Sequence, residues 1–290
     1  MGVKFMDWNN KKDVLEQVKY YGYNLAHASR ELKNDKEVVL EAVKNVGEAY
    51  RCISEELKND EEVILEAVKN FRDLSCLGIL KYVTSEELKK NKQFCLDVIE
   101  KDESSFKYIS DELKNNRDFC LEAVKRNEFI LKDIPEQFKN DKEIVLNAVK
   151  KFSLLLEKAS DELRNDKEVV MEAVKKDSRA LRGASDELKR DKDFCKKLLR
   201  DTLKCSCIEH IDESIRNDVI YEVVKEDSSF MSHLTTYCDY LKGYTLGDIE
   251  DLKTIHFINT LQDAVYKNEL DNFKEKHKDL FNDNNISVTD

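Results

Sequence analysis

The residues whose types and spacing are best suited to chemistry are the thiols and the imidazole of the segment CSCIEH. Cys205, Cys207 and His210 are ligands of the kind that bind zinc, and His233 or Cys238 would complete a set of four. The spacing differs from that of a standard zinc finger. When the chain is aligned on its internal repeat, Cys207 occupies a position that is apolar in other repeats, so we expect it to pack in the core. We therefore expect no metal and no cofactor.

The remaining histidines form no catalytic motif. His27, His256 and His277 lie far apart in the sequence, and the chain contains no G-x-S-x-G, H-E-x-x-H or P-loop pattern. Acid pairs such as Asp161-Glu162 recur at one position of the repeat, which is typical of helix capping and of a charged surface. We expect a protein that is not an enzyme. The alternative is an enzyme whose site is assembled from residues distant in sequence.

A Lys or Arg recurs at one position of nearly every repeat, and stacked helices would place these side chains about 10 Å apart. This basic column comprises Lys33, Lys58, Lys89, Lys114, Lys139, Arg164, Lys189 and Arg216. A continuous basic surface would attract phosphate groups. However, a Glu lies two residues before most members of the column, and the chain has a net charge of −11. We therefore expect a soluble surface of mixed charge, and a nucleic-acid-binding helical solenoid is the alternative.

An internal repeat of 25 residues carries all of these side chains. The segment NDKEVVLEAVK (34–44) recurs in variants, and its last apolar residue moves by 25 residues at every step except one of 31. That residue is successively Val18, Val43, Val68, Ile99, Val124, Val149, Val174, Leu199 and Val224. The period indicates about nine repeats with a six-residue insertion near 74–80. Such periods are typical of solenoid proteins.

Each repeat predicts two helical elements. Asn34 or Asp35 can cap a first helix that is too short and too apolar to be stable alone in water. After a turn, an apolar stripe that includes Tyr50 leads to Ser54, which indicates a second N-cap. We expect an all-α fold, an α-solenoid of about nine ~25-residue two-helix repeats, whose second element is a short α-helix or a 3-10 helix.

The period ends before the chain does. We assign residues 1–242 to the repeat array, whose last repeat is degenerate after Lys225. From Gly243 the period is lost. Residues 243–290 predict an acidic C-terminal cap of two amphipathic helices, followed by a frayed tail.

The composition is typical of a helical protein of the cytoplasm. Charged residues make up 38% of the chain, which has one Pro and seven Gly. No segment has the apolar length of a signal-peptide core or of a membrane helix. Cys95, Cys120 and Cys195 occupy a column that holds Val or Ile in other repeats, so we expect buried thiols rather than disulfides. We expect a cytoplasmic location, with delivery into a host cell left open.

The repeat resembles a known family. The pattern D-x-E-V-V-L-x-A-V-K, a turn and then A-L-x-x-A-S-x-E-L-K-N-D is similar to the bacterial helical-repeat family catalogued as domain of unknown function 4116, over residues 9–225. The resemblance implies a helical-repeat fold and supplies no catalytic residue. Members of that family occur in bacteria, including host-associated ones, and in some protists. A microbial effector or anti-defence factor is therefore one role that the resemblance suggests.

Columns that vary between repeats are available for binding, because scaffold positions cannot vary freely. Two such columns directly follow the Tyr50 position, and aromatic residues and Arg in them are the side chains that dominate interface energetics. The candidate protein-binding residues are Arg51, Tyr82, Lys107, Tyr108, Lys132, Glu157 and Arg182. We expect them to form a strip that contacts a protein or peptide partner. The expected function is that of an interaction scaffold or adaptor, and the sequence leaves the oligomeric state open.

Overall fold

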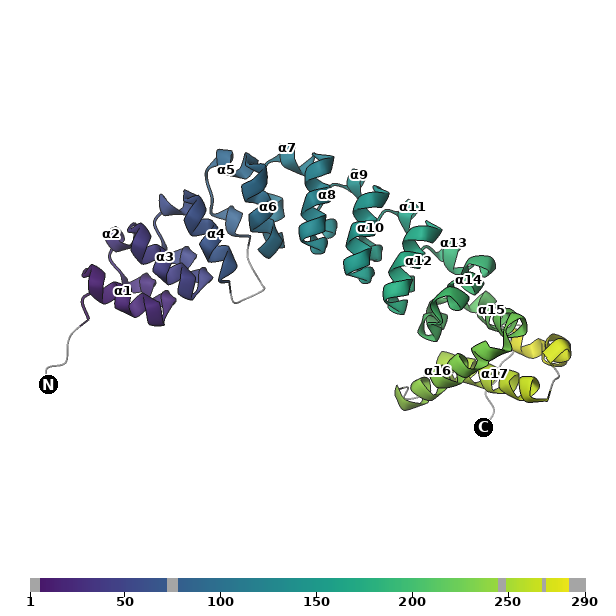
Figure 1. The fold of residues 1–290 in the computed structure, drawn as a ribbon. Helices are drawn as coiled ribbons and strands as arrows, with labels where there is room; N and C mark the ends of the chain where they lie inside the picture. Colours follow the sequence, from purple (N-terminus) through teal and green to yellow (C-terminus); the bar gives the residue numbers. More distant parts are fainter. Residues whose placement is uncertain (1–5, 72–77, 245–248, 268–269, 282–290) are drawn as a thin grey trace, which may run out of the picture. The chain divides into compact units, whose positions relative to one another are not determined.

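The chain is all-helical, and its helices follow the predicted repeat. The computed structural model describes residues 6–71, 78–244, 249–267 and 270–281, and these residues contain no strand. A typical repeat consists of a long α-helix, a 3-10 helix and a one-turn α-helix (Figure 1). The predicted all-α solenoid is confirmed, and its second element divides into two short pieces.

Three sets of elements build the repeats. The long helices are α1 (Lys11–Tyr20), α3 (Lys36–Asn45), α4 (Glu61–Lys69), α6 (Lys92–Lys101), α8 (Arg117–Arg126), α10 (Lys142–Lys151), α12 (Lys167–Lys176), α14 (Lys192–Thr202) and α15 (Glu213–Glu226). The 3-10 helices are η1 (Gly22–His27), η2 (Gly47–Cys52), η4 (Ile79–Lys81), η5 (Glu103–Tyr108), η6 (Glu128–Lys132), η7 (Ser153–Lys158), η8 (Ser178–Gly183) and η9 (Cys205–His210). The short pieces are α2 (Arg30–Lys33), η3 (Leu57–Asn59), α5 (Glu86–Lys90), α7 (Asp111–Lys114), α9 (Glu136–Lys139), α11 (Asp161–Arg164) and α13 (Asp186–Lys189).

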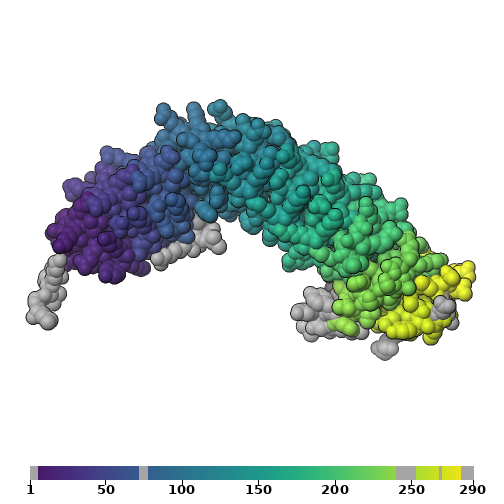
Figure 2. Space-filling view, in the orientation of Figure 1, coloured from purple at the N-terminus to yellow at the C-terminus, as the bar shows by residue number. Residues whose placement is uncertain are grey.

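The chain divides into two compact units, Met1–Phe138 and Lys139–Asp290. In the first unit α1 packs on α3, α3 on α4, α4 on α6 and α6 on α8. In the second unit α10 packs on α12, α12 on α14 and α14 on α15, and η7, η8 and η9 contact one another in order. Within each unit the neighbouring colours of Figure 2 therefore touch, because each repeat contacts the repeat that follows it.

The core of each unit is the seam between successive long helices. The recurring valines Val43, Val124, Val149 and Val174 are fully buried, and Val68 is 4% exposed. A helix of ten residues is marginal in water by itself. Burying one such side chain contributes on the order of 1.5–3 kcal/mol, so stacking on a neighbour stabilises the long helices.

Polar side chains define where each helix begins. Asp35 caps α3 by accepting hydrogen bonds from the amides of Glu37 and Val38. The predicted serine caps are also confirmed, since Ser54 accepts from the amide of Leu57, and the equivalent serines accept in the same way. Those serines are Ser29, Ser85, Ser110, Ser160 and Ser185.

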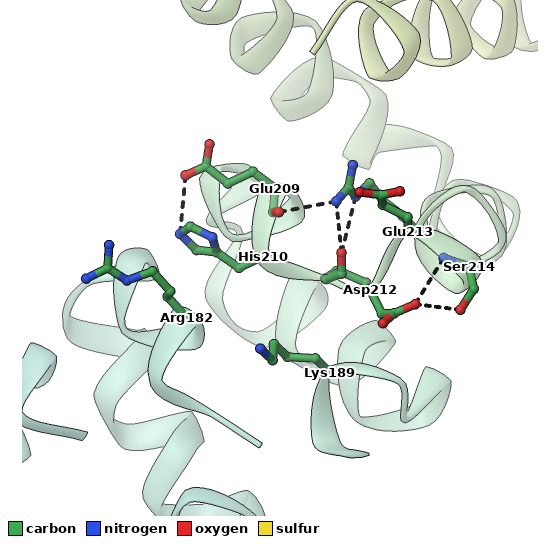
Figure 3. Close-up of a pocket in the computed structure, with 9 residues that line it drawn as sticks. Arg182, Lys189, Glu209, His210, Asp212, Glu213 and Ser214 are labelled. Carbon is green, nitrogen blue, oxygen red and sulfur yellow. Dashed lines mark hydrogen bonds and ion pairs between the residues drawn. The ribbon is translucent and has the colours of Figure 1, made fainter. Parts of the chain in front are cut away.

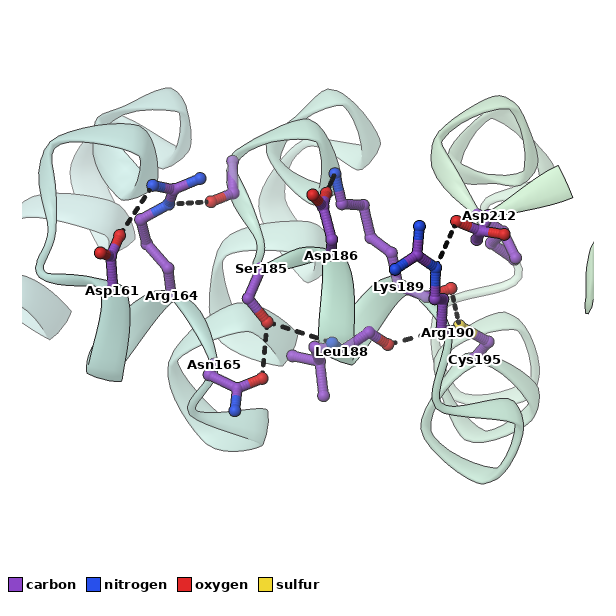
Figure 4. Close-up of polar contacts among 12 residues, drawn as sticks. Asp161, Arg164, Asn165, Ser185, Asp186, Leu188, Lys189, Arg190, Cys195 and Asp212 are labelled. Atoms are coloured by element: carbon purple, nitrogen blue, oxygen red, sulfur yellow. Dashed lines mark hydrogen bonds and ion pairs between the residues drawn. The ribbon is translucent and has the colours of Figure 1, made fainter. Parts of the chain in front are cut away.

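Asn34 joins two repeats instead of capping a helix. Its side-chain oxygen accepts a hydrogen bond from the Ser54 hydroxyl at 2.5 Å, and its amide donates to Glu56 at 2.7 Å. We call this arrangement the Asn–Ser latch. It recurs as Asn140–Ser160–Glu162 and as Asn165–Ser185–Glu187. Figure 4 shows the contact between Asn165 and Ser185. The Glu of each latch therefore joins repeats, a role that the sequence pattern of alternating charge did not indicate.

A backbone hydrogen bond runs beside each latch. The amide of Ser185 donates to the carbonyl of Arg164 at 2.9 Å, and four further serines make the same bond, Ser29, Ser54, Ser110 and Ser160. Pro135 replaces the serine once and has no amide hydrogen to donate. At that junction the carbonyl of Lys114 accepts instead from the Cys120 thiol at 3.1 Å.

One junction replaces both partners of the latch. Arg190 stands at the Asn position and Asp212 at the Ser position, and they form an ion pair with 2.8 Å between Nε and Oδ2 (Figure 4). Asp212 keeps the capping role, because it accepts from the amide of Ser214 at the start of α15. The two substitutions compensate each other, which is evidence that these positions interact.

A second connection, the lysine clamp, joins the starts of successive long helices. Lys142 contacts the carboxylates of Asp166 and Glu168, each at 2.8 Å. Lys11 and Lys36 hold Asp35–Glu37 and Asp60–Glu62 in the same way. Where the Lys is replaced by Glu61, the two positions equivalent to its partners hold the neutral Asn91 and Gln93.

The last repeat ends the array differently. Two residues present in the segment LRNDKEVV (163–170) are missing from IRNDVI (215–220), so the short and long helices merge into the 14-residue α15. The helices that follow α15 are η10 (Ser228–Phe230), α16 (Met231–Tyr244), α17 (Ile249–Tyr266), η11 (Leu270–Asn272), α18 (Phe273–Lys276) and η12 (Lys278–Phe281). α16 runs across the predicted boundary at 242, and the second predicted cap helix consists of three short pieces.

The C-terminal pieces cover α15. The Tyr221 ring stacks on Phe273 with 5.8 Å between centroids, and the Asn217 side chain donates to the carbonyl of Leu280 at 2.6 Å. Lys274 bonds to Asp218 at 2.7 Å. The predicted tail beyond residue 281 and most of the insertion near 74–80 lie outside the described residues.

Exchanging the Arg190–Asp212 pair for an Asn–Ser latch tests the junction. We expect Arg190→Asn and Asp212→Ser each to lower the free energy of unfolding by about 0.5–1 kcal/mol, because each removes a partly exposed ion pair. The double variant should lose less than the sum, because it rebuilds the pairing of other junctions. Urea denaturation of the four proteins measures the coupling, and strictly additive effects would contradict the contact.

The clamps should make stability depend on acid. Hydrogen bonds from Lys167 and from the amide of Phe194 lower the pKa of Asp191 below its usual value of about 3.9. A carboxyl whose pKa is lowered on folding stabilises the fold above its unfolded pKa, and this contribution is lost as the pH falls through its folded pKa. We expect the urea midpoint to decrease as the pH is lowered below about 4, and we expect this decrease to be smaller in Lys167→Met. Lys175→Met, which removes a pair within one helix, is the control.

Candidate binding site

The predicted strip residues lie on the 3-10 helices of the two units. In the first unit Arg51 lies in η2, Tyr82 directly follows η4, Lys107 and Tyr108 end η5, and Lys132 ends η6. In the second unit Glu157 lies in η7 and Arg182 in η8. A 3-10 helix buries one edge on its own long helix and leaves the other edge to solvent. The charged members are therefore exposed, whereas both tyrosines are half-buried.

The two tyrosines pack on the scaffold. Tyr82 meets the Tyr50 ring edge-on at 6.4 Å, and the Lys58 ammonium lies 5.8 Å from its centroid. The Tyr108 ring lies against Gly78, where a Cβ atom would come within 2.5 Å of it. Gly78 has a φ of 68°, a conformation that favours glycine. Because each ring packs on the scaffold, only part of its surface is accessible to a partner.

Glu157 and Arg182 lie on neighbouring repeats of the second unit. Their carboxylate and guanidinium are 3.9 Å apart, and the Arg182 side chain is 73% exposed. Such an exposed and distant pair holds a side chain only weakly. Arg182 can therefore turn toward a ligand, and it stands at the edge of a cavity.

This cavity has a volume of about 460 Å³ and lies between η8, α13, η9 and the start of α15 (Figure 3). It is lined by Arg182, Lys189, Glu209, His210, Ile211, Asp212, Glu213, Ser214 and Arg216. The cavity brings together residues from two segments that the sequence analysis treated separately. Lys189 and Arg216 belong to the basic column, and His210 belongs to the segment considered as a metal site.

Positive charge reaches His210 from three elements. Burial, followed by the charges of Arg182, Lys189 and Arg216, lowers the pKa of His210 below its usual value of about 6.5. The nearest acid to the imidazole is Glu209, with 3.3 Å between Oε1 and Nε2. Burial and the surrounding positive charges therefore favour the neutral ring.

Arg216 is fixed in place. It is 9% exposed, and its guanidinium donates to the backbone carbonyls of Ile211 at 3.0 Å and Glu209 at 3.2 Å, at the end of η9. The preceding member of the basic column, Lys189, instead pairs with the exposed carboxylate of Asp186 at 2.7 Å. The fusion of α15 accounts for the difference, because this arginine is held inside a long helix rather than at the end of a short one.

Comparison with known proteins agrees with this repeat structure. The family model described as a domain of unknown function (DUF4116) matches residues 10–58, 35–89, 60–114, 91–139, 141–189 and 166–216. The chain belongs to the DUF4116 family. The last DUF4116 match ends at Arg216, so the cavity lies where the family repeat gives way to the fused helix. No curated protein and no solved structure matches the chain.

Outside this cavity, the cysteines of the DUF4116 repeats behave as core residues. Cys207 is fully buried, as predicted, and burial raises the pKa of Cys205 to about 12, which keeps its thiol protonated at neutral pH. Cys95, Cys120 and Cys195 are likewise buried and free. Among the described residues no three His, Cys, Asp or Glu side chains are grouped to hold a metal ion. None of the helices in this part of the chain is long and apolar enough to cross a membrane.

The basic column of the DUF4116 repeats is largely neutralised. Lys89 pairs with Glu86, Lys114 with Asp111 and Lys189 with Asp186, in each case an acid three residues earlier. Lys58 and Arg164 pair in the same way. From the sequence, we expected the Glu two residues earlier to balance each basic residue. In the structure several of those glutamates belong to the Asn–Ser latches instead. The expected mixture of charges is nevertheless present.

Titration of His210 tests the electrostatics of the cavity. We expect its pKa in the native protein to lie below about 6.5. Arg182→Met should raise it, because removing a nearby positive charge favours the protonated ring. NMR of the histidine ring protons measures the pKa directly. Arg179→Met removes an equal charge from the same 3-10 helix, outside this cavity, and should leave the value almost unchanged.

Proposed function

We propose that this protein is a non-enzymatic interaction scaffold that binds a partner protein or peptide on the exposed edges of its 3-10 helices. One observation carries the proposal. From one repeat to the next, a buried position keeps its residue type, as Val149 and Val174 show. An exposed position of the 3-10 helices changes the sign of its charge, as Glu157 and Arg182 show. A scaffold of constant core and variable surface is the property by which solenoid proteins bind extended partners.

The chemistry of the variable positions supports a protein ligand. Arg51 and Lys107 are exposed on η2 and η5, and the Lys107 ammonium lies 5.1 Å from the centroid of the half-buried Tyr108 ring. Rigid aromatic faces beside long basic side chains are typical of interface anchors. The net charge of −11 and the pairing of the basic column favour a protein over a nucleic acid. In this proposal the protein acts in the cytoplasm, and the role of a bacterial effector or anti-defence factor follows from the family alone.

Affinity capture with matched surface variants tests the proposal. The strip variant carries Arg51→Glu and Lys107→Glu in the first unit, and a second variant carries Arg182→Glu in the other. We expect at least one variant to lower capture of the main partner by about 10-fold or more, as loss of interface anchors does. The control variant carries Lys44→Glu and Lys69→Glu on the long helices, which changes the charge equally and should preserve capture.

The comparison must be made between folded proteins, so circular dichroism and a melting curve accompany each variant. Partners that are retained by both strip variants and lost by the control would place the binding surface on the long helices. That result would overturn the proposal for the 3-10 helices. Equal capture by all four proteins would overturn it as well.

A further inference from the structure

We propose that the cavity between η8, α13, η9 and α15 binds a doubly charged oxyanion, the phosphate monoester of a phosphorylated side chain in the partner. The source of the phosphate rests on the proposed function, whereas the capacity of the cavity to bind an anion does not. The cavity measures about 460 Å³, which is room for a phosphorylated side chain with its hydration. Its mouth carries the exposed strip residue Arg182, so a partner on η7 and η8 would reach it directly.

Basic groups from separate elements converge on this space. Arg182 comes from η8, Lys189 from α13 and His210 from η9 (Figure 3), and Arg216 comes from α15. A phosphate monoester has three terminal oxygens and a charge of about −2 at neutral pH, so it can accept from several such donors at once. Charge-assisted hydrogen bonds of this kind are roughly twice as strong as neutral ones.

Three acids line the cavity beside the basic groups, and one of them, Asp212, is already paired. Asp212 bonds to Arg190 and to the amide and hydroxyl of Ser214. Lys189 is paired with Asp186, whose side chain is 76% exposed, and such a pair is easily exchanged for a stronger anion. Glu213 is exposed at the start of α15. Glu209 contacts His210, with 3.3 Å between Oε1 and Nε2, and Glu157 lies 3.9 Å from Arg182.

Arg216 supplies a positive charge that is fixed in place. Its guanidinium is bound to the carbonyls that end η9, so it does not have to be ordered when a ligand arrives. Groups that are fixed before binding lose less conformational entropy on association. Arg182 and Lys189 are the movable groups that close on the anion, and His210 lies between them and Arg216.

His210 links anion binding to pH. The groups that face it are Glu209 on its own element, Arg182, Lys189 and Arg216. In the free protein burial and the three cations hold its pKa down, so the ring is neutral at pH 7. A bound dianion reverses part of that field and raises the pKa, and linkage then requires the anion to bind more tightly as the pH falls.

Sulfate is the first probe, because it remains doubly charged over the whole range in which histidine titrates. With the full-length protein, we expect sulfate and inorganic phosphate to shift the His210 ring signals saturably, with a dissociation constant below about 10 mM. Acetate, with a single charge, should bind at least about tenfold more weakly. N-acetyl-phosphoserine amide should bind at least as tightly as inorganic phosphate.

Three variants and a control assign the site. Arg182→Met and Lys189→Met should each weaken sulfate binding by about tenfold, measured by calorimetry, because each removes one charge-assisted donor. His210→Gln should keep binding at pH 8 and lose the increase in affinity at low pH. Arg179→Met, on η8 but outside the cavity, should bind sulfate as the native protein does.

The contrary outcomes are equally specific. Absence of any His210 shift with sulfate, equal affinity for acetate, or equal loss in Arg179→Met would overturn the anion site. Binding of inorganic phosphate without binding of N-acetyl-phosphoserine amide would overturn the phosphorylated partner as its source. These titrations use no partner protein, so they can fail while the strip variants still lose the partner, and they can succeed while all strip variants retain it.

Discussion

Every repeat of this protein depends on burying its long helix against the next repeat. The helices are about ten residues long and carry apolar residues on two sides, so neither intrinsic propensity nor a single neighbour is sufficient to stabilise them. Hydrophobic contact supplies the free energy, but it is not directional. The Asn–Ser latches and the lysine clamps supply the direction, because hydrogen bonds and ion pairs between defined atoms fix how one repeat lies on the next.

The architecture could be predicted from the sequence because equivalent positions of successive repeats can be compared within the one chain. The position of Val174, the caps formed by Ser185 and the burial of Cys195 all followed from residue types that recur every 25 residues. The latches were not predicted, since Asn165 and Glu187 are common surface residues whose partners lie 20 to 22 positions away. The fused α15 was also missed, although the missing pair of residues before Val219 was visible as a shift of frame.

The candidate site was harder to predict for a related reason. A repeat pattern identifies what is common, whereas the cavity is formed by what occurs once. From the sequence, we considered His210 as a metal ligand and Arg216 as a member of the basic column, each alone, and we did not single out Asp212. Their proximity results from the last junction, where the merging of two helices buries an arginine that other repeats leave outside.

The Arg190–Asp212 pair gives that last junction a chemical identity of its own. Repeats joined by Asn and Ser carry interchangeable ends, so gene duplication or deletion can change their number without mismatching any partner. The junction with the terminal assembly, in contrast, is formed by an arginine and an aspartate. This arrangement lets the length of the array evolve freely while the site beside the terminal assembly is inherited as a single block.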